Sequence, residues 1–162
     1  MKVKKIVLLF LALLFPACVF VFLKFFGKNE FNVPPLYTDV YPEGVSECGV
    51  NITLPYHIPD SVMSSLQLSA DSLTLIHFGE LNTESRNQLS RVKKEHGMEV
   101  KTNILDDQRN AAVLKKCVFF LKEPFDLVLI DDEGVIRGQY VSGDRDEIDR
   151  LLMELSILFK KF

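Results

Sequence analysis

The sequence predicts an α/β protein: one domain with the element order β-α-β-α-β-β-α, carried on a single N-terminal transmembrane helix. Three observations lead to this prediction. Residues 6–26 form an almost uninterrupted apolar segment. Residues 72–141 alternate short apolar runs with helical patterns, and residues 144–162 repeat apolar side chains at intervals of three and four. A chain of 162 residues has room for one domain with appendages.

The N-terminal segment, IVLLFLALLFPACVFVFLKFF, is typical of an uncleaved membrane anchor. As a helix, residues 6–26 extend about 31 Å, which is enough to cross the hydrocarbon core of a bilayer. The apolar part of a cleavable signal peptide is shorter, about 7–15 residues. The one charge, Lys24, lies near the end, where its ammonium can reach the interface.

The lysines beside this segment predict its orientation. The short stretch before it contains Lys2, Lys4 and Lys5, whereas only Lys24 and Lys28 lie at its far end. Positive charges favour the cytoplasmic side of a membrane. We therefore expect a single-pass protein of the inner (cytoplasmic) membrane, with its C-terminal domain in the periplasm or otherwise outside the cytoplasm.

A lipoprotein is the alternative to an uncleaved anchor. Residues 15–18, FPAC, resemble a lipobox, which would make Cys18 the lipidated first residue of the mature chain. However, eight apolar or nearly apolar residues follow Cys18, where a lipoprotein would become polar. The uncleaved anchor is therefore the favoured interpretation.

The charge balance of the remaining chain excludes one class of partner. Outside residues 1–26 there are 15 basic and 22 acidic residues, which gives a formal charge of −7. A nucleic-acid-binding surface requires clustered Lys and Arg to neutralise phosphates. We therefore expect no nucleic-acid binding.

The distribution of prolines predicts the division of the chain. Residues 27–70 contain five of the seven prolines and show no sustained hydrophobic period. We expect residues 1–28 to be the membrane anchor, 29–70 a proline-containing stalk or extension that packs partly on the domain, and 71–162 the domain itself.

The domain begins with a predicted strand and a predicted helix. Residues 73–79, LTLIHFG, form a short apolar run rich in strand-forming residues, typical of a buried central strand. Asn82 or Thr83 can cap a helix over residues 84–96, which Gly97 ends. Only two side chains of this helix are strongly apolar, so we expect it at the surface.

A second strand and a second helix follow. Residues 98–105 alternate in polarity and predict a strand. Asp106 or Asp107 can cap a helix that runs through Lys116. The side chains expected to point inward from this helix are Ala111, Val113 and Leu114.

Two further strands are predicted to form a hairpin. Residues 125–131 and 135–141 have strand patterns, and Asp132-Glu133-Gly134 between them has turn chemistry. Asp131, Asp132 and Glu133 could suggest a cation site. On a hairpin turn, a solvated acidic loop is the favoured interpretation.

The last helix has the clearest amphipathic pattern. It begins near Asp144, with acidic residues in its first turn and Lys160 and Lys161 in its last, as the helix dipole favours. Such a face can lie on a membrane, but we expect it to pack on the sheet. Its apolar stripe consists of Ile148, Leu151, Leu152, Leu155, Leu158, Phe159 and Phe162.

This order of elements is that of the thioredoxin core, in which a parallel crossover is followed by an antiparallel hairpin. Thioredoxin-like folds place a cis-proline before the third strand, and Pro124 occupies that position here. More narrowly, residues 75–79 (LIHFG) and 129–138 (LIDDEGVIRG) resemble the first core strand and the final hairpin of the SCO/SenC family. These proteins are membrane-anchored and take part in copper delivery to cytochrome oxidase.

The chain departs from that family at the copper site. The resemblance implies two cysteines spaced C-x-x-x-C after the first strand and a histidine near the cis-proline. The corresponding positions here are Thr83, Asn87 and Glu123, beside Pro124. A hydroxyl, an amide and a carboxylate neither exchange disulfides nor suit Cu(I), which prefers soft sulfur ligands. We therefore regard these as vestigial active-site positions and expect no catalytic residue, metal or cofactor there.

Cys48 and Cys117 are the only cysteines beyond the anchor, an even number in a compartment expected to be oxidising. A structural disulfide is the favoured interpretation. A metal or redox pair and two separate buried thiols are the alternatives. His57 and His77 could also be ligands, but His77 lies within an apolar strand, where a hydrogen-bonded, partly buried histidine is the usual case.

Two functions remain. The first is a non-catalytic thioredoxin-like module that binds an unidentified protein partner in the cell envelope, with respiratory complex assembly as the process suggested by the resemblance. The second is a copper-handling or thiol-disulfide redox protein that uses Cys48, Cys117 and a histidine. The first is favoured, and an enzyme is the less expected outcome, because an oxidoreductase of this fold keeps its thiols beside the cis-proline.

Overall fold

The structure, a computed structural model, describes residues 2–26, 32–68, 72–106 and 109–159. The chain divides into two compact units, residues 1–32 and 33–162. The boundary therefore lies before residue 33, whereas the sequence placed the start of the domain at residue 71. The first unit contains helix α1 (Lys2–Phe26). Among the described residues, no helix is long and apolar enough to cross a membrane.

The second unit is built on a four-stranded mixed sheet, which confirms the predicted α/β class. The strand order is β2-β1-β3-β4. Strand β1 pairs in parallel with β2 and antiparallel with β3, and β3 pairs antiparallel with β4. The four strands are β1 (Leu73–Phe78), β2 (Val100–Leu105), β3 (Leu127–Ile130) and β4 (Ile136–Tyr140).

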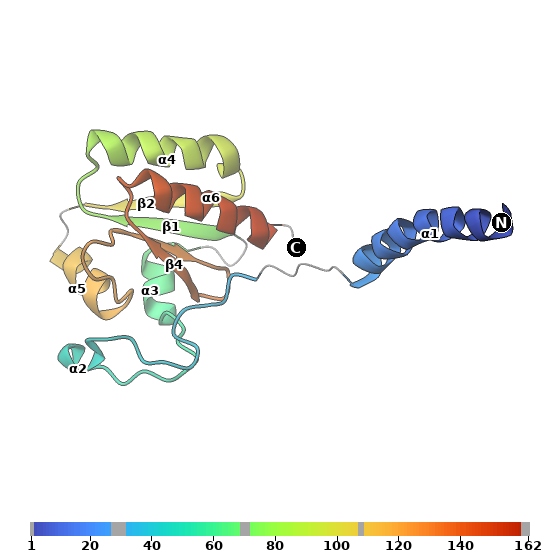
Figure 1. Ribbon diagram of the computed structural model, residues 1–162. Coiled ribbons are helices and arrows are strands. Elements are labelled where there is room, and N and C mark those ends of the chain that lie inside the picture. The colour runs from blue at the N-terminus through green and yellow to red at the C-terminus, as the bar shows by residue number, and fades with distance from the viewer. Residues whose placement is uncertain (1, 27–31, 69–71, 107–108, 160–162) are drawn as a thin grey trace. The chain divides into compact units, whose positions relative to one another are not determined.

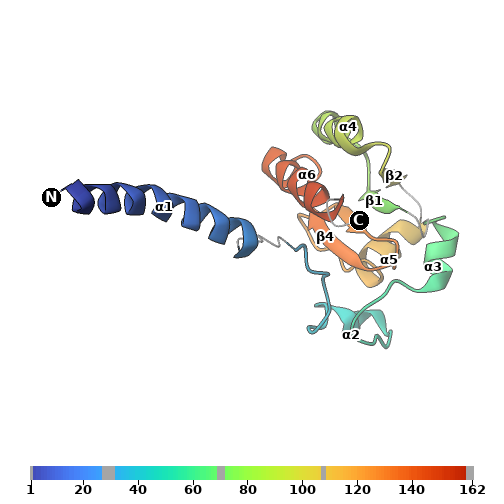
Figure 2. The ribbon, with the colours of Figure 1, turned by 90° about the vertical axis from the view of Figure 1, so that its right-hand side faces the viewer.

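Helices α4 (Thr83–His96) and α6 (Arg145–Phe159) cover one face of the sheet (Figures 1 and 2). Five residues of the apolar stripe of α6 are buried there and Phe159 is partly buried, so the prediction that this helix packs on the sheet is confirmed. Lys160, Lys161 and Phe162 lie outside the described residues. The core on this face includes Leu75, Leu129, Leu89, Val92, Ile148, Leu151, Leu155 and Leu158.

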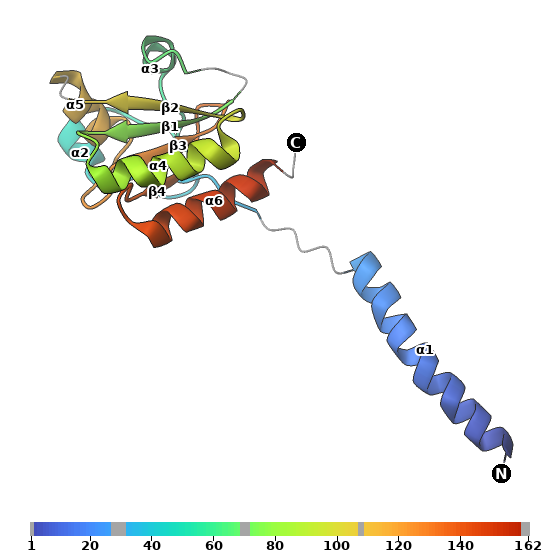
Figure 3. The ribbon, with the colours of Figure 1, turned by 90° about the horizontal axis from the view of Figure 1, so that it is seen from above.

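The opposite face of the sheet packs against α5 (Arg109–Cys117) and residues 36–68, which contain the short helices α2 (Val45–Cys48) and α3 (Asp60–Ser65). The view from above separates α5 from α4 and α6 across the sheet (Figure 3). The predicted inward face of α5 is correct for Ala111 and Leu114, which pack against this core, but wrong for Val113, which is 60 % exposed.

The extension belongs to the domain because both its side chains and its backbone are bonded to it. Tyr37 and Tyr56 each meet the ring of Phe120 edge to face, at centroid distances of 5.7 and 5.1 Å. Leu36 donates a backbone hydrogen bond to Ile136 (2.8 Å). The proline-rich composition suggested a stalk, but it is equally compatible with an irregular segment that follows the edge of a sheet.

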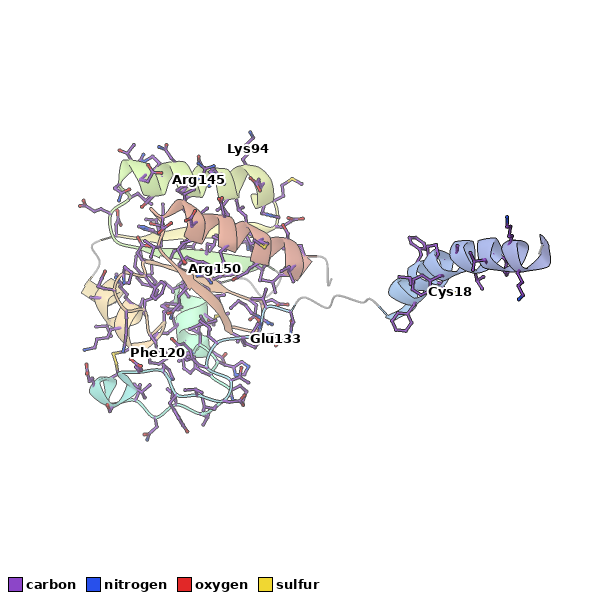
Figure 4. The ribbon with its side chains drawn as sticks, in the orientation of Figure 1. Cys18, Lys94, Phe120, Glu133, Arg145 and Arg150 are labelled. Carbon is purple, nitrogen blue, oxygen red and sulfur yellow. A yellow bond between two sulfur atoms is a disulfide. The ribbon has the colours of Figure 1, made fainter. Side chains whose placement is uncertain are left out.

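The β3–β4 hairpin is organised by the carboxylate of Asp131, which is only 4 % exposed. Its Oδ1 accepts hydrogen bonds from the backbone N–H of Glu133 (3.1 Å) and Val135 (2.8 Å), and its Oδ2 pairs with Arg137 Nε (2.7 Å). The prediction of a solvated acidic loop is therefore wrong for Asp131, because the turn uses this carboxylate internally. It is correct for Asp132 and for Glu133, which is labelled in Figure 4.

Tyr140 fixes the position of β4 beneath α6. Its ring is fully buried, its hydroxyl donates to Glu154 Oε2 (2.5 Å), and the Arg150 guanidinium lies 4.5 Å from the ring centroid. Burial is the main cause that raises the pKa of Tyr140, and the Glu154 carboxylate raises it further. The hydroxyl therefore stays protonated and keeps donating. A Cβ atom on Gly138 would lie 2.1 Å from this hydroxyl oxygen.

We predict that Gly138→Ala lowers the free energy of unfolding by about 1–3 kcal/mol, because Tyr140 is held by Glu154 and Arg150 and cannot move away from the new methyl group. Urea unfolding of the full-length chain in detergent micelles, followed by circular dichroism, measures this change. Gly143→Ala is the matched control, since its Cβ would approach nothing closer than 3.5 Å. Equal stability of the two variants would contradict the prediction.

Candidate functional site

The strand register brings four chain segments together at one end of the sheet. His77 lies opposite Ile104 on β2 and Leu127 on β3, and Leu127 lies opposite Tyr140 on β4. The chain therefore leaves β1, β2 and β4 and enters β3 at the same end. We call this the site end of the sheet. It carries the loop after Phe78, the start of α4, the segment before β3 and the loop after β4.

The vestigial positions all lie in these segments, and all are exposed. Thr83 is the first residue of α4, and the cap before it is Asn82, whose Oδ1 accepts a hydrogen bond from the Ser85 N–H (2.7 Å). Asn87 lies one turn further along. Pro124 follows a cis peptide bond, as the resemblance implied for this position.

Glu123 is directed to a different partner. Its Oε1 forms an ion pair with Lys115 Nζ of α5 at 2.9 Å. Within the described part of the chain, no hydrogen bond or ion pair joins Glu123 to Thr83 or Asn87. The structure thus places all three positions at the site end of the sheet, but it does not bring their side chains together as a ligand set.

Beneath this exposed surface lies a buried polar cluster that the sequence did not predict. It consists of His77 on β1, Ser85 on α4, Asp126 before β3 and Ser142 after β4. Ser142 Oγ lies 2.7 Å from Ser85 Oγ, 2.7 Å from Asp126 Oδ2 and 3.1 Å from His77 Nε2. His77 Nε2 also lies 3.6 Å from Asp126 Oδ2. The cluster ties the first turn of α4 to three strands.

The single hydroxyl proton of Ser142 allows one consistent assignment of the hydrogen bonds. The carboxylate of Asp126 can only accept, so Ser142 donates to it. Ser142 then accepts from the Ser85 hydroxyl and from an Nε2–H of His77. The other ring nitrogen, His77 Nδ1, is buried and has no hydrogen-bond partner among the described residues.

Asp126 has two opposing influences on its ionisation. Burial raises the pKa of this carboxyl, but the nearby imidazole of His77 and the hydrogen bonds from the hydroxyl and backbone N–H of Ser142 more than offset that effect. The pKa of Asp126 is therefore lower than its usual value. The backbone bond, from Ser142 N to Asp126 Oδ1, is 2.6 Å long. At neutral pH the cluster is built around a carboxylate.

The cluster contains the residue types of a Ser-His-Asp triad without its geometry. In a triad the serine donates to the histidine, whose other nitrogen is held by the aspartate. Here Ser142 donates directly to Asp126, and His77 Nδ1 is unpartnered. The side chains of Ser142 and His77 are 0 % and 1 % exposed, so no substrate can reach them. The arrangement holds segments in place and has no accessible nucleophile.

The two histidines considered as ligands have other environments. His77 is hydrogen-bonded, as expected, but fully rather than partly buried. His57 is exposed, and its Nδ1 lies 3.1 Å from the carbonyl oxygen of Pro55. Within the described ranges, no group of three or more His, Cys, Asp or Glu side chains is placed to hold a metal ion.

Cys48 and Cys117 form a disulfide between α2 and α5, which confirms the favoured interpretation. Their Cα atoms are 5.5 Å apart, and the sequence separation is 69 residues. Closing a loop of that length stabilises the fold by about 4 kcal/mol on a chain-entropy estimate. Lys116 and Glu47 form an ion pair beside it (2.7 Å). The third cysteine, Cys18 of α1, is free and exposed (Figure 4).

No protein-family model matches the chain, and a comparison with curated proteins finds no match. The geometry itself defines a mixed α/β domain with an exposed, thiol-free surface at the site end of its sheet. That surface rests on a buried carboxylate-centred cluster, and a disulfide elsewhere fastens the extension.

We predict that Asp126→Asn lowers the free energy of unfolding by about 1–3 kcal/mol near neutral pH. The folded-state pKa of Asp126 lies below its unfolded value of about 3.9, so its stabilisation is complete above that pH and is lost as pH falls through the folded-state pKa. The variant should therefore lose less stability than the wild type on acidification. Urea unfolding of the full-length chain across the acidic range measures this, with the exposed Asp132→Asn as control. Parallel pH profiles for wild type and Asp126→Asn would contradict the prediction.

Proposed function

We propose that this chain is a membrane-anchored, non-catalytic thioredoxin-like module, similar to the SCO/SenC proteins, that binds a partner protein in the cell envelope. Assembly of a respiratory complex is the process that the resemblance suggests. The proposal has three parts, namely the fold type, the loss of redox and copper chemistry, and the anchor. Each has its own support.

The fold type is supported by the topology of the sheet. The order β2-β1-β3-β4, with a parallel first pair and two antiparallel pairs after it, matches the arrangement of a thioredoxin core. Pro124 precedes β3 at the site end of the sheet, and α4 and α5 lie on opposite faces. Resemblance of a fold does not carry function, so the function depends on the residues at that end.

The placement of the cysteines carries the functional proposal. The positions that resemble a copper or redox site hold the exposed side chains of Thr83, Asn87 and Glu123. The two cysteines of the domain are joined to each other between α2 and α5. Thiol exchange requires a thiolate, and Cu(I) prefers sulfur donors. A surface with these side chains is suited to hydrogen bonding with another protein.

Membrane attachment is supported by residues 6–26, which carry a single charge. Large apolar side chains of α1 are exposed in the structure, and a lipid environment would accommodate them. They include Leu8, Phe10, Leu14, Phe15, Val19, Phe20 and Val21.

We predict that the full-length protein, purified in detergent, neither reduces insulin nor retains Cu(I) against a competing chelator. Three alanine variants test the proposed binding surface, namely Thr83→Ala, Asn87→Ala and Glu123→Ala. In membranes, each should reduce photo-crosslinking of the protein to its partner. Each should change the free energy of unfolding by less than about 0.5 kcal/mol, as for most exposed positions. Glu95→Ala, an exposed change at the far end of α4, is the control.

One equivalent of tightly held copper, lost on replacement of Cys48 or Cys117, would reject this proposal in favour of the copper-handling or redox alternative. So would insulin reduction that depends on these cysteines. Unchanged crosslinking of all three alanine variants would remove the site end of the sheet as the binding surface.

We predict that residues 2–5 stay in the cytoplasm, that the chain is not cleaved, and that the domain is exported. The reason is the excess of lysines before the apolar segment. A C-terminal alkaline phosphatase fusion should be active, and a C-terminal fluorescent protein that folds only in the cytoplasm should be dark. N-terminal sequencing checks cleavage, since a mature chain beginning at Cys18 would identify a lipoprotein instead.

A further inference from the structure

A cavity of about 440 Å³ opens beside the site end of the sheet, between the ends of β1 and β2 and helix α5. Its volume is within the range of about 300–1,000 Å³ typical of ligand-binding pockets. Phe78 and Leu105 line it from the strands, and Ala111, Ala112 and Lys115 line it from α5. Gly79 and Glu80, which follow β1, also line it.

Small residues keep this cavity open. Gly79 has a left-handed backbone (φ +100°), and a Cβ atom there would meet nothing within 4 Å. Its N–H donates to the carbonyl of Leu105 (3.0 Å), which holds the ends of β1 and β2 side by side. Ala111 and Ala112 present only methyl groups from α5. The lining is therefore apolar, with charged groups at Lys115 and Glu80.

The charges favour a cationic occupant. The ammonium of Lys115 is already neutralised by Glu123 at 2.9 Å. Glu80 is exposed and has no ion-pair partner among the described residues. An incoming carboxylate would have to displace Glu123 and would then face Glu80. A cation meets neither obstacle, and the formal charge of −7 beyond residue 26 attracts basic partners at longer range.

We infer that this cavity receives an arginine side chain of the partner protein. The aliphatic part of the arginine packs against Phe78 and Leu105, and the guanidinium pairs with the carboxylate of Glu80. The inference depends on the proposed function for its biological setting, because it assigns the partner's chemistry. The physical binding of an arginine side chain can be measured without the partner.

The test uses the full-length, ¹⁵N-labelled chain in detergent micelles, titrated with acetyl-Gly-Arg-Gly-amide and followed by amide chemical shifts. The expected result is saturable shifts at Gly79, Ala111 and Ala112. The matched peptide with citrulline, which has the shape of arginine without its charge, should bind about fivefold more weakly, the size expected for loss of an exposed ion pair. The peptide with glutamate in place of arginine should give no saturable shifts at these residues.

Two variants separate charge from shape. Glu80→Gln should weaken the arginine peptide about fivefold and leave the citrulline peptide unchanged. Ala112→Leu, at an exposed helical position, should fill the cavity and abolish binding of both. Glu95→Gln, on the other side of the sheet, should change the binding of neither peptide. Equal binding of arginine and citrulline peptides to the wild type, or shifts that map elsewhere, would overturn the inference.

Photo-crosslinking in membranes distinguishes this inference from the proposed function. A crosslinker at position 112 should capture the same partner as one at position 87, and Glu80→Gln should reduce both products. If position 87 captures a partner and position 112 does not, the cavity is not the binding site and the proposed function stands. If neither captures a partner while the arginine peptide still binds specifically, the proposed function fails and the cavity remains an arginine site.

Discussion

The backbone and side chain of Asp126 bond to the segments that meet at the site end of the sheet. Its carbonyl accepts from the N–H of Phe78 (2.8 Å), and its own N–H donates to the carbonyl of Tyr140 (3.1 Å). Its carboxylate accepts two bonds from Ser142, and through Ser142 it reaches Ser85 on α4. The position of the exposed surface therefore depends on one ionised, mostly buried group. Such a group is costly to bury unless its bonds are all made, which is why the cluster favours a single arrangement.

Local patterns were sufficient to predict most of the elements. The stripe of α6, the Asn82 cap, Gly97 and the apolar runs of β1 and β3 are each set by residues close together in sequence. The role of the 33–68 segment was not predictable in this way, because its burial depends on Phe120 and on β4, far away in the chain. The same applies to the buried cluster, whose members are spread from residue 77 to residue 142 and form no motif.

In the candidate site, too, some features could be predicted from the sequence and others could not. The identity of Thr83, Asn87 and Glu123 could be taken from a family resemblance, and Pro124 occupies its expected place before β3. The ion pair between Glu123 and Lys115 could not be predicted from the sequence. It joins a loop to a helix, and the distance between these two elements depends on the whole fold. The disulfide was predictable because only two cysteines lie beyond α1. Residue counts thus favoured the covalent connection, whereas the non-covalent contacts depend on the folded arrangement of the chain.

The bonds between the extension and β4 have a consequence for association between molecules. A strand at the side of a sheet presents unpaired N–H and C=O groups, which can pair with another chain and start aggregation. In this domain, Leu36 donates to the carbonyl of Ile136 at the start of β4, and Ile58 donates to that of Gly134 in the turn before it, so the beginning of this edge is already occupied. The Cys48–Cys117 bond holds the occupying segment to α5. Detachment of the segment would uncover a template for intermolecular strand pairing, which the buried side chains and backbone bonds of the segment oppose. The disulfide adds a covalent link to these contacts, so it protects the domain against association as well as against unfolding.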